Sequence, residues 1–91
     1  MAVTVRIPTT LRTFTGGQPT VEVDGANVGE VLAALEDGHP GFRDRIFGDD
    51  GRLRRFVHVF VSDEDVRYLD GLSTPVPDGA TVAIVPAVAG G

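Results

Sequence analysis

Hydrophobic and polar residues alternate near the N-terminus, and this pattern predicts the first strands of the fold. In residues 3–7, valine and isoleucine alternate with threonine and arginine, which is the two-residue period of a half-buried strand. The sequence Thr-Gly-Gly-Gln at residues 15–18 indicates a turn. Residues 21–23 form a second short alternating run, so the two runs are expected to pair as a hairpin with a long loop.

The hydrophobic period then lengthens to that of a helix. Apolar side chains recur three and four residues apart, at Val28, Val31, Leu32 and Leu35. Such spacing lines one face of an amphipathic helix. Asn27 in front of this stripe, with Glu30 three residues on, is a variant of the capping box that begins helices. Gly38, with Pro40 just beyond it, is the signal for the end of the helix.

The middle of the chain predicts a loop region and then the strongest strand. Residues 42–47 contain spaced apolar side chains that fit a short helical turn, and residues 48–51 consist of glycine and aspartate, as expected of a loop. Residues 56–61 are apolar on both faces. A strand of this kind is expected at a central position in a sheet, where both faces are covered.

Shorter signals complete the pattern and set the fold class. Residues 62–65 indicate a turn, residues 66–69 a short edge strand and residues 75–79 a further turn. Residues 82–85 are expected to be the last strand, which Pro86 ends. This order predicts an α+β domain with one main helix packed across a mixed sheet. If the last strand lies beside the first in the centre of the sheet, the fold is the ubiquitin-like β-grasp.

Composition limits the chemistry that the chain can perform. With 91 residues it has the size of one domain. It contains no cysteine, and all eight basic residues are arginine, which excludes a thiolate nucleophile, a disulfide and a Schiff-base lysine. The formal charge of −5 argues against nucleic acid as a partner. No apolar run approaches the roughly 20 residues that span a membrane, and no signal-peptide core is present, so we expect a soluble cytoplasmic protein.

Internal residues with reactive or charged side chains have simple structural explanations. The two histidines, His39 and His58, do not make a recognisable metal site without cysteine. The acidic residues 63–65 could form a docking patch or a set of calcium ligands, and the arginines within residues 52–55 could meet an acidic partner. Solvated turns and loops account for both. We expect no metal, no permanently bound cofactor and no catalytic residue of the chain's own.

The strand at residues 56–61 raises a question about the exposed face of the sheet. If its three valines face the helix, then Phe56, His58 and Phe60 face outward. An exposed patch with two phenylalanines usually marks a binding site, which makes these three residues a possible partner-binding face. The alternative is that residues 41–55 fold over them, and the sequence does not decide between the two.

The C-terminal residues carry the most specific signal. We expect residues 1–86 to form the folded domain and residues 87–91, which are uncharged and end in Gly90 and Gly91, to project as a flexible tail. Five extended residues reach about 16–18 Å, and a glycine end can enter a channel too narrow for other residues. A carboxylate at its tip suits delivery into another protein's active site. A frayed terminus is the alternative.

The order of elements and the terminal Val-Ala-Gly-Gly of residues 88–91 resemble the ThiS/MoaD family of ubiquitin-like sulfur carriers. Further similarities are Ile-Pro at residues 7–8, Leu-Arg at residues 11–12 and Asp-Gly at residues 78–79. The resemblance implies that an E1-like enzyme uses ATP-Mg to adenylate the Gly91 carboxylate. A sulfur donor would then convert the carboxylate to a thiocarboxylate.

The resemblance also implies which partners the carrier meets. Ala87, Val88 and Ala89 would enter the active sites of partner enzymes, with Gly90 and Gly91 at the reacting end. The stretches that look closest to the carriers of actinobacterial cysteine biosynthesis are residues 15–18, 55–57, 63–67 and 86–91. In that subgroup a cysteine synthase with pyridoxal phosphate accepts the sulfur, and a zinc metalloprotease of the JAMM type releases the product.

Other functions stay open at this point. The same carrier chemistry could feed a thiosugar synthase or another pathway of secondary metabolism. The chain could instead be a ubiquitin-like interaction module that is never activated and binds through the face of Phe56 and Phe60. It could also be a tag joined by its C-terminus to lysines of other proteins.

Overall fold

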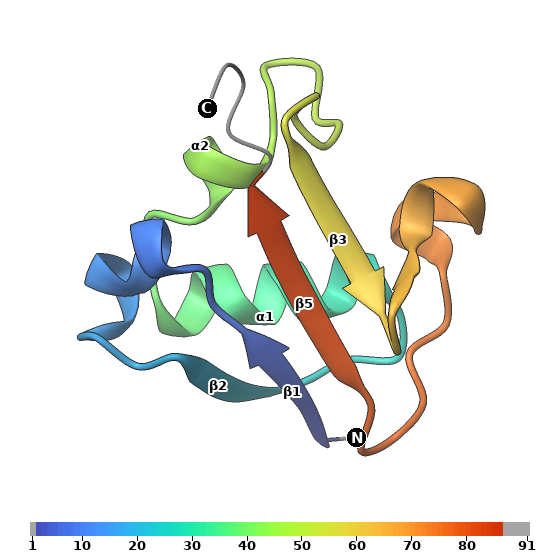
Figure 1. Cartoon of the computed structure of the whole chain (residues 1–91), viewed down its shortest axis with the longest axis horizontal. Coiled ribbons are helices and arrows are strands. Elements are labelled where there is room, and N and C mark those ends of the chain that lie inside the picture. The colour runs from blue at the N-terminus through green and yellow to red at the C-terminus, as the bar shows by residue number, and fades with distance from the viewer. Residues whose placement is uncertain (1, 87–91) are drawn as a thin grey trace.

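A five-stranded sheet is built around the first and last strands of the chain. The structure is a computed structural model that describes residues 2–86. Strand β1 (Ala2–Arg6) pairs with β2 (Thr20–Asp24) as an antiparallel hairpin and with β5 (Thr81–Pro86) in parallel. Strands β3 (Val57–Val61) and β4 (Glu64–Asp65) complete the order β2-β1-β5-β3-β4 (Figure 1).

This topology confirms the predicted β-grasp and corrects one strand position. The last strand lies beside the first in the centre of the sheet, as expected. The strand β3 was expected to be central, but β5 holds that position and β3 lies one place from the edge. Strand β3 still has a neighbour on each side, and its inner face is buried whereas its outer face is only partly buried.

The main helix, α1 (Val28–Gly38), crosses one face of the sheet (Figure 1). The predicted capping box is present at its start. Asn27 Oδ1 accepts a hydrogen bond of 2.8 Å from the Glu30 N–H, and Glu30 Oε1 accepts one of 2.9 Å from the Ala26 N–H. Two donors at the start of the helix are thereby satisfied. All four residues of the predicted apolar stripe are buried, which confirms the helix face.

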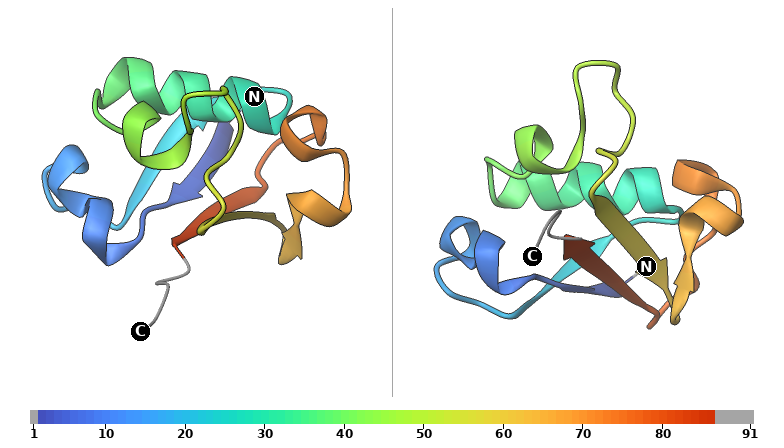
Figure 2. Two further views of the ribbon diagram at one scale, coloured as in Figure 1. Left: turned by 90° about the horizontal axis from the view of Figure 1, so that it is seen from above. Right: turned by 45° about the horizontal axis from the view of Figure 1, so that its top comes forward.

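The core lies between α1 and the inner face of the sheet. Alternate residues of the long strands are buried in it: Val3, Val5, Val57, Val59, Val61, Val82 and Ile84. The predicted short helical turn is the helix α2 (Arg43–Ile46), and the buried residues Phe42 and Ile46 pack into the same core. Both helices lie on one side of the sheet, and no helix formed by residues 2–86 lies over the opposite face (Figure 2).

The hairpin loop contains a 3₁₀ helix, η1 (Thr9–Thr15), that the apolar pattern does not predict. It ends at Gly16, whose φ of 66° lies in the left-handed region that favours glycine. The predicted turn at residues 15–18 is therefore correct. The Thr15 hydroxyl, which is buried, donates to a neighbouring carbonyl oxygen and holds this turn.

The edge strand predicted at residues 66–69 is wrong. The edge strand is β4, and a 3₁₀ helix, η2 (Val66–Tyr68), follows it. Residues 62 and 63 have φ of 50° and 73°, which turns the chain back early enough for β4 to pair with β3, so the predicted turn is shorter than expected. The Asp65 carboxylate then accepts a hydrogen bond from the Arg67 N–H, and such a cap favours a helical turn over extended chain.

Candidate functional site at the end of the last strand

The last strand ends in a fixed position beside the start of β3. Pro86 at the end of β5 pairs with Val57 at the start of β3, and Ala83 pairs with Arg6 at the end of β1. The chain beyond β5 therefore begins from a defined point on the sheet. Several predicted site residues lie outside the described residues: Ala87, Val88, Ala89, Gly90 and Gly91. The predicted domain boundary after residue 86 and the predicted tail stay predictions.

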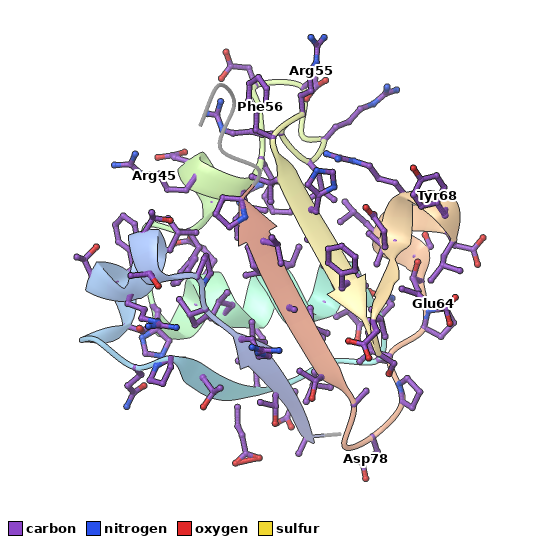
Figure 3. All side chains as sticks on the ribbon, in the orientation of Figure 1. Arg45, Arg55, Phe56, Glu64, Tyr68 and Asp78 are labelled. Atoms are coloured by element: carbon purple, nitrogen blue, oxygen red, sulfur yellow. The ribbon has the colours of Figure 1, made fainter. Side chains whose placement is uncertain are left out.

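The outer face of β3 is open to solvent. Phe56, in the turn before the strand, is 51% exposed, and the outward-facing His58 and Phe60 are half-buried. Phe42 and Ile46 pack into the core on the helix side, and residues 48–55 border Phe56 without burying it. Of the two sequence-based alternatives, the structure shows the open face, and Figure 3 places Phe56 beside Arg55 at the end of the molecule. Binding of a partner there stays a prediction.

A polar cluster at the edge of the sheet fixes the position of the His58 ring. Its Nδ1 lies 3.0 Å from Asp65 Oδ2 and 3.2 Å from Arg67 Nη1. An imidazole nitrogen that carries hydrogen donates to the carboxylate, whereas a bare one accepts from the guanidinium. His58 Nδ1 cannot donate and accept at the same time. It binds Asp65 when it carries a hydrogen and Arg67 when it does not. Sequence analysis missed this cluster because it depends on the register that places Asp65 opposite Phe60.

The neighbouring groups of this cluster change the pKa of the Asp65 carboxyl group. Partial burial raises the pKa of its carboxyl group. The backbone hydrogen bond from Arg67, the side-chain hydrogen bond with His58 and the positive charges of both residues lower it, and the net effect is a pKa below the ordinary value of 3.8. Asp65 is therefore ionised at neutral pH and links β4 to β3 and η2.

Within residues 2–86 neither a metal site nor a membrane span is found. No three histidine or acidic side chains of these residues gather closely enough to hold a metal ion. No helix among them combines the length and the apolar character that a membrane crossing needs.

The fold and this site define a class: a small ubiquitin-like β-grasp protein with a Gly-Gly sequence a few residues beyond its central strand. The ThiS family model matches residues 5–91, and the chain belongs to the ThiS family.

Comparison with individual proteins narrows the assignment. The sulfur carrier protein CysO of Mycobacterium tuberculosis is 48% identical over 93 aligned positions, which cover the whole of both chains. A chain in the crystal structure of the BexX/CysO complex of Amycolatopsis orientalis has a TM-score of 0.91 at 50% identity, with 98% of this chain and 99% of that chain covered. The small archaeal modifier protein SAMP1 of Haloferax volcanii has a TM-score of 0.84 at 32% identity over the full length of both. The chain is a sulfur carrier protein of the CysO type, a carrier rather than an enzyme.

Proposed function

We propose that this carrier holds sulfur as a thiocarboxylate at Gly91 and delivers it to cysteine biosynthesis in the cytoplasm. In the proposed reaction an E1-like enzyme transfers AMP from ATP-Mg to the Gly91 carboxylate and releases pyrophosphate. A sulfur donor then displaces AMP, which leaves sulfur in place of one carboxylate oxygen. The observation that carries the proposal is the Gly-Gly sequence at residues 90–91, which follows the central strand of a ThiS-family domain.

The folded domain supports this reaction by providing a rigid base. Strand β1 pairs with β5 as far as Ala83, and β3 pairs with it up to Pro86. Five further residues can span at most about 16–18 Å. Adenylation needs the carboxylate in line with the α-phosphate, and placement to about an ångström governs its rate. Glycine at residues 90 and 91 suits a narrow channel. ATP-Mg belongs to the activating enzyme, and the carrier itself keeps no bound cofactor.

A cysteine synthase is the sulfur acceptor that we favour. The full-length identity of 48% with CysO of M. tuberculosis supports it. In this scheme a metalloprotease of the JAMM type releases the product from the carrier. A thiosugar synthase or another enzyme of secondary metabolism is the second candidate acceptor. The A. orientalis complex pairs a similar carrier with BexX, which supports the idea that a carrier of this type serves more than one partner.

The outer sheet face is the surface that we propose for docking of these partners. Phe56, His58 and Phe60 combine exposed aromatic area with a histidine held by a carboxylate. Aromatic side chains dominate the energetics of many interfaces. The face also adjoins the end of β5, because His58 pairs with Val85, which is 44% exposed. A partner seated there would lie next to the start of the tail.

Intact mass spectrometry tests the proposed reaction. The protein is incubated with an E1-like enzyme from the same organism, ATP-Mg and sulfide. Exchange of one oxygen for sulfur at the activated acyl group raises the mass by about 16 Da, and omission of ATP should prevent the gain. A mass that never changes with any such enzyme would support an interaction module that is not activated. A gain that persists without ATP would rule out the adenylation step.

A further inference from the structure

Arginines gather where the last strand leaves the sheet. Two shallow hollows flank the end of β5, one beside β1 and one beside the start of β3. Six of the eight arginines line them, and only two of the thirteen carboxylates, those of Asp49 and Asp50, do so. We call these six the arginine rim: Arg6, Arg12, Arg52, Arg54, Arg55 and Arg67.

Sheet topology brings the rim together from distant parts of the sequence. Strand β1 is parallel to β5 and β3 is antiparallel to it, so the end of β1 and the residues before β3 reach the same end of the sheet as Pro86. The turns at the other end carry carboxylates instead. Figure 3 shows Arg45 and Arg55 toward one end of the molecule and Glu64 and Asp78 toward the other. A chain of net charge −5 thus has a basic end.

Most charges of the rim have no carboxylate partner among residues 2–86, and the exception is Arg67, whose charge acts on Asp65. Among residues 2–86, none of the six arginines forms an ion pair with a carboxylate. Arg12, Arg54 and Arg67 donate to backbone carbonyl oxygens of Ile7, Asp44 and Arg54. Within that part of the chain, Arg6, Arg52 and Arg55 have no side-chain hydrogen bond, so their guanidinium groups are available to a partner.

We propose that the arginine rim docks on a ring of carboxylates around the mouth of the channel through which the activating enzyme receives the tail. This inference rests on the proposed function. In this scheme the tail enters the channel extended, which spans up to about 16–18 Å, so that the rim stays at the mouth and away from the α-phosphate. An exposed ion pair contributes little affinity. Several charges of the same sign, however, steer two proteins toward each other and orient them during the encounter. The rim therefore acts on the rate of productive docking.

The test compares variants inside and outside the rim, with a purified E1-like enzyme that thiocarboxylates the wild-type chain. Arg52→Ala/Arg55→Ala removes two charges from the rim, and Ser73→Glu/Thr81→Glu adds two negative charges outside the rim, all at exposed positions. We expect the rim variant to lose about 5- to 10-fold in kcat/KM at low salt with kcat unchanged. The difference should vanish near 1 M salt, where charges are screened within about 3 Å.

Each outcome of the comparison has a defined meaning. Equal losses in the two double variants would show that net charge alone matters and would overturn the inference. An unchanged kcat/KM in the rim variant would also overturn it, while leaving the proposed function intact. If no E1-like enzyme thiocarboxylates the wild-type chain, the proposed function fails and the inference fails with it.

Discussion

Asp65 links three elements through one carboxylate. Its Oδ1 accepts a hydrogen bond of 2.9 Å from the Arg67 N–H, and its Oδ2 lies 3.0 Å from His58 Nδ1. Only 11% of the side chain is exposed, so water replaces few of these interactions. Because its pKa is below the ordinary value of 3.8 in the fold, ionised Asp65 stabilises the native state above that pH. The contribution is lost as the pH falls through the lower, folded-state pKa.

The substitution Asp65→Asn should therefore lower stability and flatten its acid dependence. We expect a loss of about 1 kcal/mol in the free energy of unfolding at pH 7, because the bonds to the charged oxygens weaken. Below pH 3.8 the wild type should lose this advantage and converge on the variant. Urea unfolding curves between pH 7 and pH 2 measure both effects.

The matched control makes the same chemical change two residues away. Asp63 is exposed and has a φ of 73°, which asparagine tolerates. Asp63→Asn should leave the stability and its pH dependence nearly unchanged. If Asp65→Asn shows the same acid dependence as the wild type, Asp65 does not have a lowered pKa.

Hydrophobic periodicity and capping residues predicted the elements well where these local signals determine the structure. The helix at residues 28–38 has both a cap and an apolar stripe, and its start at Asn27 was predicted correctly. The hairpin of β1 and β2 follows from period-two alternation, and the final strand from the short apolar run at residues 82–85 that Pro86 ends. The central pairing of β1 with β5 also agrees with the order of elements.

Other features could not be predicted because they depend on tertiary register. Residues 66–69 contain apolar side chains typical of a strand, yet the Asp65 cap turns them into a 3₁₀ helix. The cluster around His58 depends on the register of the hairpin between β3 and β4, and the arginine rim forms only after strands distant in sequence pair. The residues that carry the proposed sulfur chemistry lie beyond residue 86, and their assignment comes from sequence and family membership.

The strand β3 separates core residues from surface residues along one short segment, and this allows a paired test of the docking face. Val59 is fully buried, whereas its neighbour Phe60 is half-buried on the outer face. We expect Phe60→Asp to keep the fold and to weaken binding of the activating enzyme at least about 10-fold, the loss typical of a buried aromatic at an interface. Circular dichroism and a binding titration measure the two effects.

Val59→Asp is the control for this experiment. A carboxylate buried in the core without a partner costs several kcal/mol, so this variant should not fold. An unfolded Phe60→Asp would mean that Phe60 belongs to the core. A folded Phe60→Asp that binds as tightly as the wild type would exclude the outer face as the docking surface.

In the whole molecule, the folded domain provides the stability and the C-terminus carries the proposed chemistry. The core uses side chains from β1 to β5 within residues 3–84, while the proposed chemistry needs only the terminal carboxylate. Stability and activity should therefore respond to different parts of the chain. Changes near Gly91 are expected to leave the melting temperature unchanged, because the described core is built from residues 3–84.

The mass of C-terminal variants after reaction with the activating enzyme tests the central claim most directly. Gly91→Val, deletion of Gly91 and a C-terminal tag should each abolish the gain of about 16 Da that marks the thiocarboxylate. A side chain would obstruct the channel, and one residue more or fewer would move the carboxylate by about 3.5 Å. An N-terminal tag should permit the full gain, and all variants should melt like the wild type. Thiocarboxylation of a C-terminally extended chain that has not been trimmed back to Gly91 would contradict the account.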